Sequence, residues 1–184
     1  MSYHSGNNLI DAKLLLEKSH IQEAMHIVDL GCGRTGHVVF SGSKAVGEKG
    51  IVYAVDILKD VLESIRRRAA IEAVHNLEII WGDIGRKNGV LIAPKTVDAI
   101  FCVNVLYHFS NYNDVLSEAS RILKDKGRIT IVDWKINLSG IGPQDESMVN
   151  FDKVLLWAKE NNFFVQEDID VGKYHRGIFL YRHL

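Results

Sequence analysis

Three features are scarce in this sequence: cysteine, net charge and long apolar runs. It contains two cysteines, Cys32 and Cys102, and both fall in segments whose residues predict a strand or the end of one. A reduced thiol in such a segment behaves as a small buried hydrophobe, which disfavours a disulfide or a cysteine-based metal site. The histidines are scattered and are not paired with acids at metal-ligand spacing, so we expect no bound metal.

The formal net charge of -1 at pH 7 gives no overall field that would hold the protein on a phosphate backbone or an anionic membrane. We therefore expect neither nucleic acid nor a membrane as a partner. The first twenty residues include acids and histidines, and nowhere do about 18 apolar residues follow one another, so we predict neither a signal peptide nor a membrane span. The expected protein is soluble and cytoplasmic, and its oligomeric state is left open.

The 184 residues, 47% of them apolar, are enough for one substantial core, and we predict a single domain over residues 1–184. Apolar residues at helical spacing predict a helix over Asn8–Ile21, which makes residues 1–25 an N-terminal helical cap. After a first strand that ends at Leu30, the same patterns predict helices over His37–Val46, Leu58–Val74, Tyr112–Leu123 and Phe151–Asn161. They predict further strands over Ile51–Val55, Leu77–Trp81, Val97–Val103, Arg128–Asp133, Phe163–Val171 and His175–Arg182.

This alternation predicts an α/β fold of the doubly wound, Rossmann-like kind, with a mostly parallel seven-stranded sheet covered by helices on both faces. The short Gly172-Lys173 connection between the last two strands implies an antiparallel hairpin at the C-terminus. Two details of the helices and strands also carry predictions. The run Arg66-Arg67-Arg68 is most simply a solvated helix face, and Trp81 is expected to lie in the core or in a cofactor wall.

The stretch Ile27–Gly36 is an apolar strand that leads into a glycine-rich turn, and a second strand ending in Asp56 follows about twenty residues later. Glycines at a strand end let the backbone turn sharply and approach a ligand, and an acid at the end of the next strand can accept hydrogen bonds from ribose hydroxyls. The pattern predicts a nucleotide-cofactor site. Asp56 and Asp83 could instead cap a helix or form a turn, and Asn104 could be a turn residue after a buried strand.

Together with that turn, several short motifs resemble the class I S-adenosylmethionine-dependent methyltransferase family, in particular its small-molecule branch related to ubiquinone and menaquinone biosynthesis. The motifs are Val28-Asp29-Leu30-Gly31-Cys32-Gly33, Val55-Asp56-Ile57, Gly82-Asp83-Ile84, Val97-Asp98-Ala99-Ile100, Asn104-Val105-Leu106-Tyr107-His108 and Arg121-Ile122-Leu123-Lys124. The resemblance implies S-adenosylmethionine as cofactor and assigns its binding to Asp29, Gly31, Cys32, Gly33, Asp56, Ile57, Asp83, Ile84 and Asn104. In this family the glycine loop contacts the methionine part, Asp56 would hold the ribose, and Ile57, Asp83 and Ile84 would surround the adenine.

The resemblance implies an enzyme that transfers a methyl group in line to an acceptor. The acceptor is expected to be a small molecule, in a pocket walled by Lys135–Asn150 and the N-terminal helix. His108, just past the fourth strand, is the first candidate for a general base. The loop is one residue longer than usual in the family, so Gly31-x-Gly33-x-x-Gly36 also fits the dinucleotide-binding fingerprint. This fit leaves an NAD-binding protein as one alternative to the methyltransferase. A second alternative is a non-catalytic S-adenosylmethionine-binding module.

Overall fold

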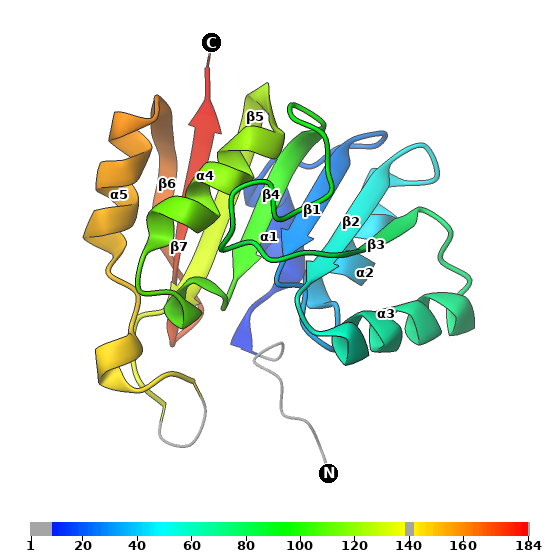
Figure 1. The fold of residues 1–184 in the computed structure, drawn as a ribbon, viewed down its shortest axis with the longest axis horizontal. Coiled ribbons are helices and arrows are strands. Elements are labelled where there is room, and N and C mark those ends of the chain that lie inside the picture. The colour runs from blue at the N-terminus through cyan, green and yellow to red at the C-terminus, as the bar shows by residue number, and fades with distance from the viewer. Residues whose placement is uncertain (1–8, 139–141, 184) are drawn as a thin grey trace.

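The structure, a computed structural model, describes residues 9–138 and 142–183 (Figure 1). Its helices are α1 (Ala12–Lys18), α2 (His37–Val46), α3 (Lys59–Ile71), α4 (Tyr112–Ile122) and α5 (Phe151–Glu160), with short 3-10 helices η2 (Leu106–His108) and η3 (Asp145–Ser147). Its strands are β1 (His26–Leu30), β2 (Ile51–Asp56), β3 (Leu77–Trp81), β4 (Val97–Val103), β5 (Leu123–Trp134), β6 (Phe163–Val171) and β7 (His175–Arg182).

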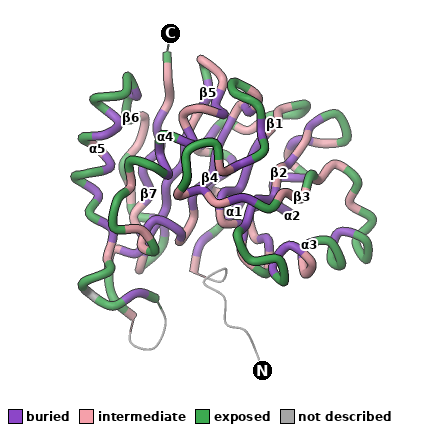
Figure 2. Tube along the Cα trace, viewed as in Figure 1, coloured by how far each residue is buried: buried purple, intermediate pink, exposed green. Residues whose placement is uncertain are grey.

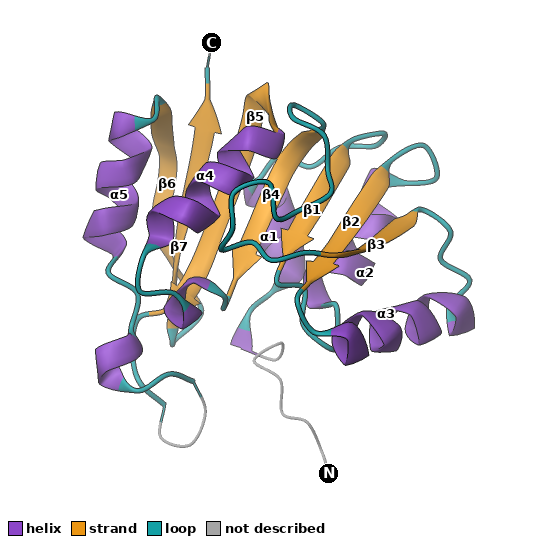
Figure 3. Ribbon diagram, viewed as in Figure 1, coloured by secondary structure: helices purple, strands orange, loops and turns teal. Residues whose placement is uncertain are grey.

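All seven strands form one sheet in the order β3-β2-β1-β4-β5-β7-β6. Strands β1 to β5 pair in parallel, and β7 pairs antiparallel with both β5 and β6 (Figure 3). This confirms the predicted fold class and the C-terminal hairpin. The chain runs outward from β1 to β3 and then returns to place β4 on the other side of β1, so the strand order reverses between β1 and β4. Open α/β sheets bind ligands at such a point.

Two apolar clusters cover the faces of the sheet. One joins the central strands to α4 and α5, and the other joins them to α1, α2 and α3. The strand centres are buried, while most of the exposed chain lies on the outer helix faces and the loops (Figure 2). Cys32 and Cys102 are both buried free thiols. Within the described residues, no helix is long and apolar enough to cross a membrane.

Most predicted ends lie within one residue of the observed ones, but three elements differ by more. The helix predicted over Leu58–Val74 ends three residues early, at Ile71. The N-terminal helix is shorter than Asn8–Ile21, because the side chain of Asp11 accepts a hydrogen bond from the amide of Lys13 and so starts α1 at Ala12. Residue 8 lies outside the described residues. Strand β5 begins at Leu123, five residues before the predicted Arg128, because Leu123 already pairs with Val97 and the ladder then shifts register before Arg128 pairs with Ala99.

Trp81 is also placed differently from the prediction. It ends β3, which is an edge strand, and 48% of its surface is exposed. Its indole Nε1 donates to the carbonyl oxygen of Ile57 at 2.8 Å. Trp81 therefore braces the chain that leaves β2 rather than filling the core.

Candidate functional site

The turns that follow β1, β2, β3 and β4 meet at the carboxyl edge of the sheet, beside the point where the strand order reverses. Leu30 pairs with Val55, and Asp56 pairs with Trp81. The glycine turn, the connection from Asp56 into α3 and the turn after Trp81 therefore leave the sheet next to one another. The sequence predicted each of these turns, and the parallel register brings them together.

The glycine turn packs closely against the chain that follows β4. Gly31 has φ +79°, and a Cβ built on it would lie 2.5 Å from Cγ2 of Val105. Its amide and that of Cys32 both donate to the carbonyl oxygen of Val55 at 2.9 Å. Gly33 also has positive φ, at +63°, but no heavy atom lies within 4 Å of its Cβ position. Position 31 thus requires glycine for two reasons, its positive φ and its close contact with Val105, whereas the Cβ position of Gly33 faces open space.

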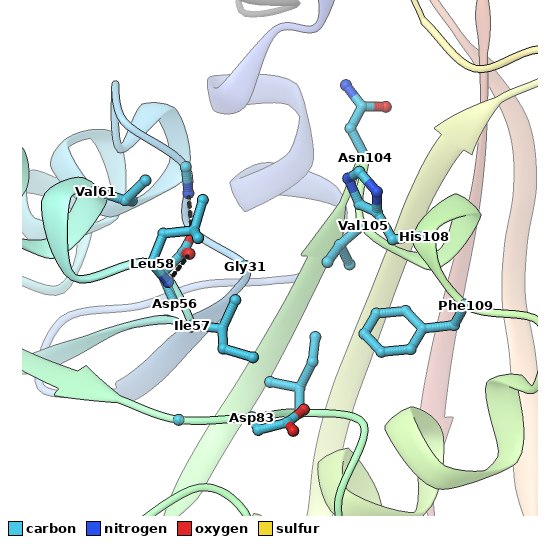
Figure 4. A pocket seen from close by; sticks show the side chains of 13 residues that line it. Gly31, Asp56, Ile57, Leu58, Val61, Asp83, Asn104, Val105, His108 and Phe109 are labelled. Carbon is cyan, nitrogen blue, oxygen red and sulfur yellow. Dashed lines mark hydrogen bonds between the residues drawn. The ribbon is translucent and has the colours of Figure 1, made fainter.

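Asp56 connects three elements through one carboxylate. Its Oδ2 accepts from the amide of Gly33 at 3.1 Å, and its Oδ1 accepts from the amide of Leu58 at 2.9 Å (Figure 4). The second contact forms a turn before α3 and is not the helix cap that the sequence left open, since Leu58 is the N-cap of α3. The first contact belongs to the glycine turn. Each carboxylate oxygen can accept more than one hydrogen bond, so both retain capacity for a ligand hydroxyl.

Asp83 and Ile84 form the turn after β3. The Oδ1 atom of Asp83 accepts from the amide of Gly85 at 3.0 Å, which is the turn role expected of aspartate. The side chain of Ile84 is buried, and within the described residues its amide makes no hydrogen bond. That amide can therefore donate to a ligand.

Asn104, directly after β4, has φ +54°, a left-handed conformation that is uncommon outside glycine. Its Oδ1 is buried and has no hydrogen-bond partner in the part of the chain that the structure describes. Strained backbone and an unsatisfied polar atom both occur preferentially where a ligand binds. Figure 4 shows Asn104 and His108 on the same side of the cavity.

These turns enclose a cavity of about 420 Å³, within the usual range for small-molecule sites. It is lined by Gly31, Gly33, Asp56, Ile57, Leu58, Val61, Gly82, Asp83, Ile84, Asn104, Val105, His108 and Phe109. All the predicted site residues except Asp29 and Cys32 are in this set. Sequence reasoning missed Leu58, Val61, Gly82, Val105 and Phe109. Four of these five residues are next in sequence to a predicted site residue, and this proximity was the signal that could have identified them.

Asp29 and Cys32 are buried next to the glycine turn in the chain. Burial, reinforced by the charge of Asp56, raises the pKa of Asp29 to about 7, and its Oδ1 has no partner among the described residues. Burial also raises the pKa of the Cys32 thiol, which packs with the apolar cluster beside α2 and α3. Neither residue is among those that line the cavity.

On the opposite side, Asp133 holds the turn that carries His108. Asp133 is fully buried at the end of β5, and its Oδ2 accepts from the amide of Leu106 at 3.0 Å. Burial raises its pKa to about 7, although hydrogen bonds from nearby amides oppose the shift. The ring of His108 contacts that of Tyr107, with 3.9 Å between the ring centroids and 35° between the ring planes. Burial lowers the pKa of His108 below 6.5, and the charge of Asp56 opposes this.

An open α/β sheet with a glycine turn and an acid at neighbouring strand ends defines a nucleotide-cofactor-binding protein. Comparison with known proteins specifies the family. Residues 21–175 match the methyltransferase domain family, and the chain belongs to it. It is also similar to a solved S-adenosylmethionine-dependent methyltransferase from Aquifex aeolicus, with TM-score 0.84 and 26% identity over 97% of this chain and 93% of that one. The resemblance to class I methyltransferases is confirmed.

Two curated relatives extend the comparison. The "Probable cobalt-precorrin-6B C(15)-methyltransferase (decarboxylating)" of Sulfurisphaera tokodaii is 30% identical over 118 residues, 64% of this chain and 58% of that protein. The mitochondrial ubiquinone biosynthesis O-methyltransferase of Schizosaccharomyces pombe is 24% identical over 160 residues, 77% of this chain and 56% of that protein. The chain therefore spans between half and three fifths of the length of these relatives.

The cavity fits S-adenosylmethionine, the cofactor of this family, on observations of the structure itself. Gly31 leaves no space for a side chain where the turn meets Val105. Asp56 offers acceptors, the Ile84 amide offers a donor, and Asn104 has an unsatisfied oxygen. Ile57 and Phe109 supply apolar surface suited to an adenine ring, and Figure 4 shows both pointing into the cavity.

Gly31→Ala should lower the free energy of unfolding by about 2–4 kcal/mol, because it adds both backbone strain at positive φ and a clash with Val105. Gly33→Ala is the matched control, since it adds similar strain without a clash and should cost about 1 kcal/mol. Urea titration of both variants measures the difference. Equal losses would contradict the close packing of Gly31 on Val105.

The raised pKa of Asp29 predicts a pH-dependent stability. The folded chain keeps this proton up to about pH 7, whereas the unfolded chain loses it near 3.8, so the free energy of unfolding falls as pH rises between these values. Asp29→Asn should reduce this slope by up to about 1.4 kcal/mol per pH unit. Urea titrations at intervals from pH 4.5 to 7.5 test this, and unchanged slopes would refute it. Some slope should remain in the variant, since the pKa of Asp133 is also raised.

Proposed function

We propose that this chain binds S-adenosylmethionine in the cavity at the carboxyl edge and catalyses methyl transfer to a small-molecule acceptor. The observation that carries the proposal is the meeting of the glycine turn, Asp56, the Asp83–Ile84 turn and Asn104 around one cavity, in a chain of the methyltransferase domain family. In this proposal Gly31 and Gly33 contact the methionine part, Asp56 the ribose, and Ile57, Asp83 and Ile84 the adenine. Asn104 lies at the reactive end, and Asp29 and Cys32 support the turn.

When bound, this cofactor supplies a methyl group on a sulfonium that is already a good leaving group. The main task of the protein is therefore to hold the acceptor in line with that methyl group and to exclude water. The apolar side chains of Val61, Val105 and Phe109 narrow the cavity. Where the acceptor must lose a proton, the ring of His108 accepts it, and its lowered pKa keeps the ring neutral at pH 7.

A small-molecule acceptor is supported by the chain's net charge of -1. It is also supported by the names of its relatives, which include a ubiquinone biosynthesis O-methyltransferase and a demethylmenaquinone methyltransferase. A strongly basic surface would be needed to favour nucleic acid. The predicted walls of the acceptor pocket are the N-terminal helix and Lys135–Asn150. Residues 139–141 of that segment lie outside the described residues, so this location stays a prediction.

Titration calorimetry with S-adenosylmethionine, S-adenosylhomocysteine and NAD in parallel tests the proposed cofactor. We expect micromolar binding of the first two compounds and none of NAD. Asp56→Ala should abolish binding, because it removes the ribose acceptor and releases the amides of Gly33 and Leu58. Asp114→Ala, an exposed acid in α4, should bind as the wild type does. Binding of NAD alone would refute the proposal.

The role of His108 is tested by methyl transfer to a panel of small phenols, thiols and amines. His108→Ala should lower kcat by about 10²–10⁴-fold while cofactor affinity is unchanged. The acidic limb of the wild-type pH profile, with its midpoint below 6.5, should disappear in this variant. His75→Ala, outside the cavity, is the control. Full activity of His108→Ala would exclude His108 as the base, and cofactor binding without any turnover would favour the non-catalytic module.

A further inference from the structure

The glycine turn has an inner and an outer half with different surroundings. Gly31 and Gly33 line the cavity, whereas Arg34 and Thr35 do not. The loop is one residue longer than the usual family pattern, and the additional residue is one of these two. They contact α3, the helix that begins at the other side of the cavity. The extra residue therefore lies on the outside of the loop.

One face of α3 makes these contacts. Asp60, Ser64 and Arg68 follow one another at spacings of four residues and so share a face of the helix. The guanidinium of Arg34 pairs with Asp60, and its Nη1 donates to Oγ of Ser64 at 3.2 Å. Arg68 Nη1 donates to the carbonyl oxygen of Thr35 at 2.7 Å. This polar face of α3 thus contacts two successive loop residues.

Arg68 is itself held in place by two further contacts. Its Cζ lies 3.9 Å from the centroid of the Phe40 ring in α2, and its Nε donates to Glu72 at 2.7 Å. Arg66, Arg67 and Arg68 are all exposed, as the predicted solvated helix face requires. Arg66 and Arg67 pair with Glu63, whereas Arg68 also reaches the glycine loop. The Arg34–Asp60 pair is exposed and contributes little. Arg68 is comparably exposed, but it donates to a backbone carbonyl of the loop and also packs on Phe40, so we take it as the main contact.

The end of the loop is tightly packed as well. Gly36 has φ +53°, and a Cβ there would lie 2.6 Å from Cδ1 of Ile65 in α3 and 3.0 Å from the Phe40 ring. At the inner end, Asp56 binds the amides of both Gly33 and Leu58, the residue before α3. The loop is thus attached to α3 at both ends. A glycine-rich segment loses much conformational freedom on ordering, and a segment ordered beforehand loses less when it binds a ligand.

We propose that Asp60, Ser64 and Arg68 form an anchoring face that holds the glycine loop in its binding shape before the cofactor arrives, with Arg68 as the principal positioning residue. The inference rests on the proposed function and adds residues outside the cavity that set cofactor affinity. Arg68 acts through the carbonyl oxygen of Thr35 and does not touch the cofactor. The anchoring face thereby stabilises a loop that is one residue longer than the usual family pattern.

Arg68→Ala and Arg67→Ala form the test pair, since both remove an arginine of α3 but only Arg68 reaches the loop. Calorimetry with S-adenosylhomocysteine should show about five- to tenfold weaker binding for Arg68→Ala and less than twofold change for Arg67→Ala. Hydrogen exchange of the ligand-free proteins should be faster over residues 33–37 in Arg68→Ala alone. Once an acceptor is known, Arg68→Ala should raise KM for the cofactor and leave kcat at saturation unchanged.

Arg68→Lys keeps one charged donor and should fall between the wild type and Arg68→Ala in both affinity and exchange. If Arg68→Ala does not fold, Arg68→Lys is compared with Arg67→Ala in its place. Equal affinity and equal exchange of the loop in the Arg68 and Arg67 variants would overturn the anchoring role. Failure of the wild type to bind either cofactor compound would instead overturn the proposed function, and the exchange comparison would still report on the anchoring of the loop.

Discussion

The site depends on the carboxylate of Asp56. A carboxylate that is only 8% exposed must find hydrogen-bond donors, and Asp56 takes them from the amides of Gly33 and Leu58. These contacts tie the glycine turn after β1 to the start of α3 after β2. Because β2 also sets the register of β3, the position of the Asp83 turn follows from the same strand. The Asp56 side chain thereby joins two of the four turns that enclose the cavity, and the pairing of β2 with β3 places the third beside them.

The fourth turn, after β4, is held by different chemistry. Asp133 accepts from the amide of Leu106, and the turn in this way keeps Val105 against Gly31 and His108 in the cavity wall. Asp29, at the end of β1, lies on the other side of β4. Three buried acids therefore stand near one edge of the sheet. Their burial costs stability, as the raised pKa values of Asp29 and Asp133 show, and such costs are typical of functional sites.

Local sequence signals predicted most of the fold and most of the cavity wall. Strand β4 has a continuous apolar run and was predicted with its observed ends, because a central parallel strand is buried on both faces. The early start of β5 at Leu123 could not be predicted, since it depends on pairing with Val97 and on the register shift that follows. The exposure of Trp81 depends on β3 being an edge strand, which is a property of the strand order. The roles of Val105 and Asp133 arise from contacts between strands that are distant in sequence.

The third glycine shows why a short motif was ambiguous here. Gly31-x-Gly33-x-x-Gly36 fits the dinucleotide fingerprint in sequence, and Gly36 does serve close packing, against Ile65 and Phe40. Close packing by the third glycine is a requirement of that fingerprint too, so the position of Gly36 does not distinguish the two cofactors. The distinction comes from residues far from the turn, because the match to the methyltransferase domain family extends over residues 21–175. The glycine pattern defines how a backbone turns under a ligand, and the surrounding turns define which ligand fits.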